Sequence, residues 1–394
     1  MVVAGVTFIA WMLSPSGSGL ADAMVHAVAV LIVACPCAMG LATPTSIMVG
    51  SGRAAELGLL FRRGAALQAL SDVRVVAFDK TGTLTEGRPR LTDLIAAEGA
   101  SEVLALAAAA EAQAEHPVGR AIVEAAMAEG DAPLTADSFV ATPGAGVAAR
   151  VAGRDVLVGS AGHLAAHGVA AEPLIGALDR LASEAKTAVL VAIDGRAAGV
   201  IAVADPLKAS AVEGLARLRG LGLKVAMVSG DNARTANAVA RGLELDEVRA
   251  EVSPADKVAV LTQLRARFGS IAFVGDGVND APALAHADVG VAMGRGSDVA
   301  IDSAEVVLMR DDVRAVAAAV ELSRAVLANI RQNLAWAFGY NVLLIPVAAG
   351  ALQPLFGMTL SPVLAAGAMA VSSVSVVSNA LRLRGFRPAL GDAT

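Results

Sequence analysis

The sequence has few charged and few aromatic residues, and it carries no excess of positive charge. Only 17% of its 394 residues are charged, only 3% are aromatic, and the formal net charge is −6. No basic run stands out, which argues against nucleic acid as a partner. Two cysteines cannot form a disulfide framework, and the absence of a G-x-x-x-x-G-K-[ST] motif argues against a P-loop ATPase.

Hydrophobic residues are abundant instead: they make up 56% of the chain, and the mean hydropathy is +0.63. This composition is too apolar for an ordinary soluble domain and too charged for a bundle of membrane helices alone. We therefore predict membrane helices beside a soluble part. Four apolar stretches are the expected helices, at residues 1–13, 21–49, 333–352 and 358–381.

The first stretch is short for a membrane span, which needs about 20 residues. It precedes Ala21-Asp22-Ala23, a possible signal-peptidase site, but it lacks the positively charged start of a signal peptide. A membrane helix shortened at its N-terminal side is the prediction.

Arginines predict the orientation of these helices. The connectors 14–19 and 353–362 carry no basic residue, whereas the arginines next to the helices lie on the other side. By the positive-inside rule, the long segment between the second and third helices is cytosolic. The expected stalks are 50–70 and 314–332, and the expected cytosolic tail is 382–394. The arginines concerned are Arg53, Arg62, Arg63, Arg324, Arg331, Arg382, Arg384 and Arg387.

The cytosolic segment contains short β-branched runs that alternate with alanine-rich helices. "VRVVAFD", "KVAMVSGD" and "SIAFVGDGVND" each predict a buried strand that ends in an aspartate and a glycine turn. Such alternation favours a parallel sheet, whose ligands bind beyond the carboxyl ends of the strands. Residues 89–199 differ in character, so we predict a second domain inserted into the sheet domain, between its parts at 71–88 and 200–313.

The motif "DKTGTLTEG" carries the most specific chemical signal. Asp79 at a strand end, followed by Lys80, Thr81 and Thr83 in a glycine turn, is suited to attack on phosphorus. A carboxylate nucleophile would form an aspartyl phosphate. The turn amides and the Thr81 hydroxyl would hold the phosphoryl oxygens. A merely polar turn is the alternative.

The motif "GDGVND" supplies further oxygen atoms. Phosphoryl transfer to a carboxylate gathers negative charge, so a hard cation such as Mg²⁺ has to neutralise it. "SGD" and "SPADK" would add a hydroxyl and a positive charge, although a lone lysine is usually a solvated surface residue. The predicted Mg²⁺ ligands are Asp79, Thr81, Asp276 and Asp280, and the further phosphate-site residues are Ser229, Gly230, Asp231, Lys257 and Asn279.

Together, "DKTGT", "SGD", "DPLK" at residues 205–208 and "GDGVND" resemble the motifs of P-type ATPases, in the expected order. "CPC" within a membrane helix resembles the heavy-metal-transporting branch. The resemblance implies α-helical membrane segments plus a cytosolic α/β part. That part would be a Rossmann-like, haloacid-dehalogenase-like phosphorylation domain with an inserted α+β nucleotide-binding domain. The implied activity is metal transport driven by phosphorylation of Asp79.

The inserted segment resembles the nucleotide-binding domain of the same branch. "EAQAEHPVGRAI" is similar to its HP motif, and "TPGAGV" is similar to its G-x-G motif, where small residues let the backbone approach the nucleotide. The family usually has asparagine where this chain has Ser160, so the usual contact is not expected there. The implied ATP-binding residues are Glu111, His116, Pro117, Gly144 and Gly146.

Cys35 and Cys37 flank Pro36 and are the soft ligands that favour Cu(I), although zinc also accepts sulfur. Pro36 would loosen the helix and turn both thiols towards one point. At this spacing the two thiols are badly placed to bond each other, so we expect them to be reduced. The alternative is that the two cysteines serve only as small apolar residues in a kinked helix.

The last two apolar stretches discriminate between metals by resemblance. Tyr340-Asn341 and the "MAVSS" motif, with Met369 and Ser373, resemble the copper class, and neither stretch has the membrane lysine and aspartate expected of a zinc-class pump. These four residues join Cys35 and Cys37 as expected ligands of transported Cu(I), and of Ag(I).

The resemblance therefore predicts a copper(I) exporter in the plasma membrane of a bacterium-like cell, with ATP, Mg²⁺, lipid and a copper chaperone as partners. No T-G-E motif of the actuator domain is present. We expect a fragment, or a separate chain that supplies this domain, and slow phosphoenzyme turnover by this chain alone. The alternatives are a zinc or cadmium exporter, a membrane-tethered phosphatase without an ATP site, and a regulatory metal-binding protein with a vestigial catalytic site.

Overall fold

The structure is a computed structural model that describes residues 1–14, 19–96, 100–114, 116–130, 134–184, 186–231 and 233–388. Its chain forms two compact units. One consists of residues 1–72 and 318–394, and the other of residues 73–317. Each unit is described by itself.

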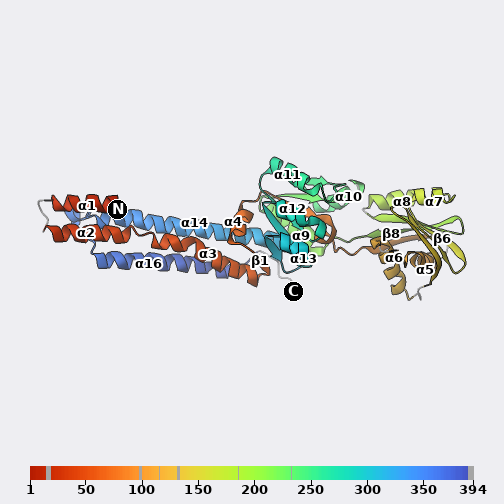
Figure 1. The fold of residues 1–394 in the computed structure, drawn as a ribbon, viewed down its shortest axis with the longest axis horizontal. Helices are drawn as coiled ribbons and strands as arrows, with labels where there is room; N and C mark the ends of the chain where they lie inside the picture. Colours follow the sequence, from red (N-terminus) through yellow and green to blue (C-terminus); the bar gives the residue numbers. More distant parts are fainter. Residues whose placement is uncertain are drawn as a thin grey trace. The chain divides into compact units, whose positions relative to one another are not determined.

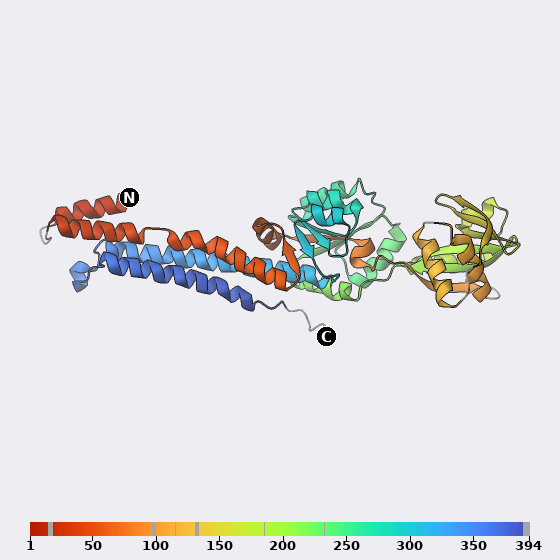
Figure 2. The ribbon, with the colours of Figure 1, turned by 60° about the horizontal axis from the view of Figure 1, so that its bottom comes forward.

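The first unit consists mainly of long helices that lie side by side in both views (Figures 1 and 2). α1 packs against α2, and α16 packs against α2 and α3. The long helices are α1 (Val2–Met12), α2 (Leu20–Val33), α3 (Cys37–Glu56), α14 (Arg314–Ala348) and α16 (Pro362–Leu381), and the short elements are β1 (Leu59–Phe61), α4 (Gly64–Asp72), α15 (Gln353–Phe356) and the 3-10 turn Arg382–Gly385.

Two of the predicted helices differ from those in the structure. The predicted helix 21–49 is interrupted between Val33 and Cys37, because Pro36 adopts a non-helical conformation (φ −83°, ψ 38°). The predicted stalk 314–332 and membrane helix 333–352 form one continuous helix, α14, which ends at Ala348. Among the described residues, two helical segments are long and apolar enough to span a membrane, Leu20–Glu56 and Pro362–Gly385.

The second unit contains a parallel sheet with strand order β13-β12-β11-β2-β9-β10. All five residues of β2 are buried, as expected for a strand covered by helices on both faces. Its strands are β2 (Val75–Asp79), β9 (Lys224–Val228), β10 (Glu247–Arg249), β11 (Ile271–Gly275), β12 (Val289–Met293) and β13 (Val306–Leu308). Its helices are α9 (Ala209–Gly220), α10 (Ala233–Leu243), α11 (Lys257–Phe268), α12 (Ala281–His286) and α13 (Asp298–Ser303).

Between β2 and β9 the chain forms a six-stranded antiparallel sheet of order β3-β8-β7-β6-β5-β4. Its strands alternate between two cores: Val191 and Ile193 join the cluster of α5 and α6, whereas Leu190 and Ala192 pack with α7 and α8. Its elements are β3 (Arg90–Ala96), α5 (Ala100–Glu111), α6 (Pro117–Ala128), β4 (Ala136–Thr142), β5 (Gly146–Val151), β6 (Arg154–Gly159), α7 (Ala161–Ala166), α8 (Glu172–Ser183), β7 (Thr187–Ile193) and β8 (Arg196–Ala204).

The predicted boundary between residues 199 and 200 is wrong, because it lies inside β8. Arg90 at the start of β3 pairs with Ala204 at the end of β8, so the antiparallel sheet continues to that residue. The predicted fold class, a parallel α/β domain with an α+β insertion, agrees with this architecture.

Candidate active site and metal-binding site

Three predicted motifs meet at one edge of the parallel sheet. β2 pairs with β9 on one side and with β11 on the other. Asp79 ends β2, Ser229 follows β9, and Asp276 follows β11. Because parallel strands present their carboxyl ends at one edge, residues far apart in the sequence become neighbours there.

Lys257 lies between two carboxylates of this edge. Its Nζ is 2.6 Å from Asp79 Oδ1 and 2.6 Å from Asp280 Oδ1, and all three side chains are buried. Asp280 is held from its other oxygen, because the amides of Asp276 and Gly277 donate to Oδ2 at 3.3 and 3.0 Å. A buried ammonium between two carboxylates offsets part of their mutual repulsion.

The carboxyl groups still repel one another despite this lysine. Burial, followed by the charge of Asp280, raises the pKa of Asp79 to about 7, although Lys257 opposes the shift. Burial and the charge of Asp280 likewise raise the pKa of Asp276 to about 6. Because the positive charge of Lys257 offsets only part of the repulsion among the three carboxylates, the site favours a bound cation.

The three carboxylates also have the geometry for such a cation. One oxygen each from Asp79, Asp276 and Asp280 lies within 4.8 Å of the other two. Hard oxygen donors at this spacing fit Mg²⁺. Thr81, the fourth predicted ligand, is exposed, as is Asn279. The structure therefore brings together the carboxylates but assigns no contact to these two side chains.

The turn after Asp79 is shaped by Gly82. Its φ of +73° is left-handed, and a Cβ at this position would lie 1.9 Å from Asp276 Oδ2. Thr83 is fully buried, and its hydroxyl approaches Asp276 Oδ1 at 3.5 Å. Only glycine permits Asp276 to lie against this turn.

Residues of the "SGD" motif form a second set of contacts. The buried Ser229 hydroxyl accepts a hydrogen bond from the Asp231 amide at 3.1 Å. The Asp231 carboxylate lies 2.5 Å from Lys80 Nζ, which ties the Asp79 turn to the end of β9. Gly230 links these residues and does not have a positive φ.

Sequence reasoning used "DPLK" only as a family motif and missed its place at the site. Lys208, 6% exposed, donates to the Gly82 carbonyl at 2.6 Å and pairs with Asp311 at 2.5 Å. Asp205 accepts a hydrogen bond from the Thr85 hydroxyl at 2.6 Å. These contacts hold the turn after Asp79 in position, and no pattern in the sequence indicates that this one lysine is buried.

The predicted nucleotide-binding residues lie in the inserted domain. Glu111 ends α5 and is 7% exposed, and burial raises its pKa to about 7. His116 caps α6, with its Nδ1 accepting from the Val118 amide at 3.3 Å, and Pro117 occupies the first helical turn. A Cβ at Gly119 would lie 2.5 Å from Glu111 Oε2, so this glycine lets α6 approach the carboxyl group.

The glycine motif lies at the turn between β4 and β5. Gly144 has φ +74° and open space around it, which suits a close approach by a ligand. Gly146 pairs with Gly159 of β6, and the ring of His163 packs where their side chains would be. Gly146 is thus required by protein packing as well. The Ser160 hydroxyl caps α7, accepting from the His163 amide at 3.2 Å.

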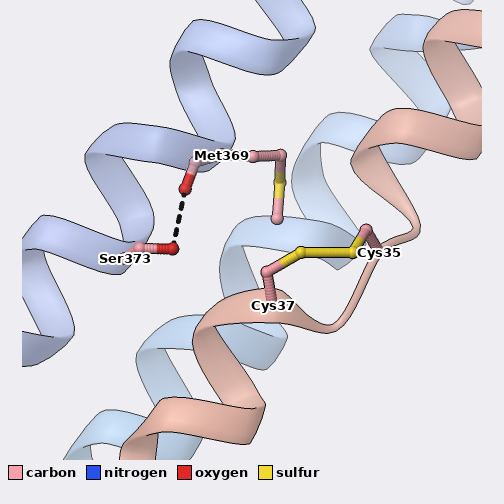
Figure 3. The surroundings of a disulfide bond; sticks show 4 residues. All are labelled: Cys35, Cys37, Met369 and Ser373. Carbon is pink, nitrogen blue, oxygen red and sulfur yellow. Dashed lines mark hydrogen bonds between the residues drawn. A yellow bond between two sulfur atoms is a disulfide. The ribbon is translucent and has the colours of Figure 1, made fainter.

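The expectation that Cys35 and Cys37 are reduced is wrong for this structure, which joins them in a disulfide (Figure 3). The break at Pro36 places their Cα atoms 5.5 Å apart, within the range that a disulfide requires. Both sulfurs therefore do converge on one point. Metal ligation requires thiolates, so this bond has to be reduced before the pair can act as ligands.

The Met369 side chain points toward this cysteine pair from α16 (Figure 3). The Ser373 hydroxyl donates to the Met369 carbonyl at 3.2 Å and is thereby engaged within its own helix. Ser372, which sequence reasoning missed, shares the buried face of α16 with Met369. Its spacing of three residues from Met369 was the available signal.

Among the described residues of the helical unit, three buried side-chain oxygens have no hydrogen-bond partner: Ser323 Oγ and Asn341 Oδ1 on α14, and Ser372 Oγ on α16. Unpaired polar atoms inside a helical bundle are costly and point to a function. Tyr340, next to Asn341, is half-buried. The structure thus places sulfur and oxygen donors on α3, α14 and α16.

The parallel sheet and its strand-end carboxylates are those of a known hydrolase class. Residues 73–288 match the family model of haloacid dehalogenase-like hydrolases, and this chain belongs to that family.

Its relatives are more specific. Copper-transporting ATPase 2 of Rhizobium meliloti is 56% identical over 99% of this chain and 47% of its own length. The silver exporting P-type ATPase of Salmonella typhimurium is 46% identical over 98% of this chain and 47% of its own length.

The structure is also similar to that of a zinc-transporting PIB-type ATPase in its E2.Pi state. The TM-score is 0.85 and the identity 38%, over 97% of this chain and 62% of that one. The predicted resemblance to heavy-metal P-type ATPases is confirmed. The chain spans about half the length of the curated relatives it matches.

Proposed function

We propose that this chain is the phosphorylated and metal-binding part of an ATP-driven exporter of Cu(I), and of Ag(I). The observation that carries the proposal is the convergence of Asp79, Asp276 and Asp280 with Lys257 at the ends of neighbouring strands. The same chain presents two cysteines and Met369 at one point of its helical unit.

In the proposed reaction, an Asp79 oxygen attacks the γ-phosphorus of ATP. The new bond joins this oxygen to phosphorus, and the bond to the bridging oxygen of ADP breaks. Mg²⁺, when held by Asp79, Asp276 and Asp280, would neutralise charge on the phosphoryl oxygens. Lys257 and Lys80 keep positive charge beside the transferred group, and Thr81 and Ser229 offer it hydroxyls.

Glu111, His116, Pro117, Gly144 and Gly146 are the proposed ATP-binding residues. Two local features support this assignment. His116 is exposed at a helix N-terminus, and Gly144 leaves open space at its turn. The helix N-terminus favours a negatively charged ligand. The carboxyl group of Glu111, whose pKa is about 7, is partly protonated at neutral pH and so repels phosphates less than an ordinary carboxylate.

The choice of Cu(I) rests on donor chemistry and on the names of the relatives. Thiolates and a thioether prefer a soft monovalent ion, and the relatives include transporters of copper and of silver. Export from the cytosolic side of a bacterial plasma membrane, with delivery by a copper chaperone, is the proposed setting. Zinc is the second candidate, because a zinc-transporting ATPase has a similar structure.

The testing experiment is acid-stable labelling of the purified, reduced chain with ATP carrying radioactive γ-phosphate. Samples receive Cu(I), Ag(I), Zn(II) or no metal, and Asp79→Asn is the control. We expect label with Cu(I) and Ag(I) that is absent from the control. Label only with Zn(II) would support the second candidate. Label that persists in the control would contradict the assignment of Asp79, and label without any metal would contradict coupled transport.

A further inference from the structure

A buried polar network connects the three helices that carry the proposed metal ligands. It consists of Ser46 on α3, Asn329 and Asn333 on α14, and Asn379 on α16, and we call it the amide network. Ser46, Asn329 and Asn333 are 0%, 6% and 1% exposed. None of the motifs described above includes these residues, and the proposed reaction does not use them.

Asn333 is at the centre of the network. Its Nδ2 donates to Ser46 Oγ at 3.1 Å and to Asn329 Oδ1 at 3.2 Å, while its Oδ1 accepts from Asn379 Nδ2 at 2.9 Å. Ser46 Oγ lies 2.8 Å from Asn329 Oδ1. Asn329 Nδ2 donates to the Asn379 carbonyl at 2.9 Å. One side chain thus links α14 to both α3 and α16.

The geometry of these bonds specifies the register of the helices. A shift of one helix by one turn, about 5.4 Å, would break every bond that it makes to the other two. The broken bonds would leave buried amide groups unpaired, which is costly. This hydrogen-bonded network, three of whose four side chains are buried, therefore favours one axial alignment of α3, α14 and α16.

Each of these helices carries proposed metal ligands at a similar distance from the network. With a rise of 1.5 Å per residue, Cys37 lies about 13 Å from Ser46, Asn341 about 12 Å from Asn333, and Met369 about 15 Å from Asn379. When the three helices are aligned at the network, the proposed metal ligands are therefore also at a similar height along the bundle. Pro44 lies inside α3 between the two levels and cannot donate a backbone hydrogen bond, so α3 is less stiff over this stretch than α14, whose internal Pro346 lies beyond Asn341.

We propose that Asn333, with Ser46, Asn329 and Asn379, is a positioning residue that aligns Cys37, Asn341 and Met369 for metal binding. The network touches no metal; it acts by fixing the axial positions of the helices. The proposal rests on the proposed function, because it takes these residues as ligands of Cu(I).

The test is a double-mutant cycle of Cu(I) affinity on the full chain in detergent, under reducing, oxygen-free conditions, with a chromophoric Cu(I) chelator as competitor. The variants are Asn333→Leu, Met369→Leu and both together. Leucine has the same number of side-chain heavy atoms as asparagine and the same branching at Cγ, but it makes no hydrogen bonds. Ser375→Ala is the matched control, because the Ser375 hydroxyl donates to the Val371 carbonyl of its own helix and, among the described residues, makes no bond to the network.

We expect Asn333→Leu to weaken Cu(I) binding about tenfold and Ser375→Ala to leave it unchanged. In the Met369→Leu background, Asn333→Leu should cause a smaller further loss, about threefold, because the part of its effect that depends on the placement of Met369 is already gone and only the alignment of Cys37 with Asn341 remains to be lost. A merely structural role would lower thermal stability without this dependence on Met369.

Unchanged affinity in Asn333→Leu, or effects that add fully with Met369→Leu, would overturn the proposal. If Asn333→Leu does not fold, Ser46→Ala takes its place in the cycle, with an expected threefold loss because α3 is less stiff. The wild-type chain and Cys35→Ser/Cys37→Ser are measured alongside. Equal Cu(I) binding by these two would refute the proposed metal site, and the network proposal with it, whereas a difference between them with no effect of Asn333→Leu refutes the network proposal alone.

Discussion

The two sites of this chain satisfy their polar groups in opposite ways. At the end of the parallel sheet, Lys257 already bridges Asp79 and Asp280, and backbone amides hold the other Asp280 oxygen. In the helical unit, Asn341 Oδ1 and Ser372 Oγ are buried without a partner among the described residues. The polar groups of the first site are held by its own residues, whereas the second contains buried oxygens that no described residue pairs.

This difference follows from what each scaffold provides. Strand ends carry free backbone amides and short turns, which can hold carboxylates in place. Helices within a bundle use their backbone groups internally, so only side chains from neighbouring helices can complete a site. We therefore expect substitutions at the helical site to act on ligand affinity, and those at the sheet site to act on catalysis and stability.

The largest effect should come from removing the sulfur donors. Cys35→Ser/Cys37→Ser should weaken Cu(I) binding by more than about a thousandfold, because two soft ligands are lost. Phosphorylation of Asp79 by inorganic phosphate should be retained. Chelator competition and acid-stable labelling check the two expectations, and wild-type chain without reductant should behave like the variant because of its disulfide. Loss of both activities would show that the sites are not separable.

Lys257→Met should reduce the rate of phosphoenzyme formation about a hundredfold, because the charge beside the phosphoryl group is lost. Asp79 and Asp280 are then left to repel each other, so the free energy of unfolding should also fall by about 3 kcal/mol. Quenched-flow labelling and denaturant unfolding measure these quantities. Lys224→Met, which removes a lysine from an exposed ion pair, is the matched control. Equal rates in both variants would remove Lys257 from the proposed site.

Gly82→Ala tests the close approach of the Asp79 turn to Asp276. The variant should lose about 2–3 kcal/mol of stability, because it combines a left-handed backbone with a Cβ 1.9 Å from Asp276 Oδ2. Gly222 has φ +78°, but a Cβ added there would meet no atom within 4 Å, so Gly222→Ala isolates the backbone cost, about 1 kcal/mol. Urea unfolding of both variants gives the comparison, and equal losses would mean that the turn relaxes.

The smallest effect concerns Glu111, whose raised pKa makes folding depend on pH. The folded state holds this proton more tightly, so stability is fully present below the unfolded pKa near 4.5 and is lost as pH rises through about 7. Glu111→Gln should remove this loss and be about 1–2 kcal/mol more stable than wild type at pH 8, with little difference at pH 5. Denaturant unfolding at pH 5 and pH 8, without nucleotide, measures this difference in stability. Glu124→Gln, at an exposed position, is the control. A pH-independent difference would contradict the shift.

The sheet site was more predictable from the sequence than the helical site. An aspartate after a buried apolar run identifies a strand end, and parallel alternation then implies that such ends are neighbours, so Asp79, Asp276 and Asp280 could be predicted together. The contacts of Lys80 with Asp231 and of Lys208 with Asp311 depend on loop paths that no local pattern specifies.

For the helices, the pattern indicated apolar segments and a loosening of the helix at Pro36, but neither the full interruption between Val33 and Cys37 nor the disulfide. A cysteine pair separated by one residue is poorly placed for bonding within a regular helix, and the prediction assumed less distortion than the structure shows. The amide network was not predicted, because each asparagine, taken singly, is compatible with a helix end or with the protein surface. The predicted domain boundary at residues 199 and 200 was wrong because β8 continues past it and pairs with β3 of the inserted sheet as far as Ala204.

The position of β2 has a consequence for how the protein is made. Val75 pairs with Lys224 on one side and with Ile271 on the other, so the strand that ends in Asp79 emerges from the ribosome well before either neighbour. The antiparallel domain is synthesised in the interval, and among the described residues its strands pair with one another and not with β2. Folding of a chain through distant pairings is slow, and unpaired strands are prone to aggregation while they wait. The proposed nucleophile, Asp79, is therefore among the first residues of its sheet to be synthesised and among the last to be enclosed.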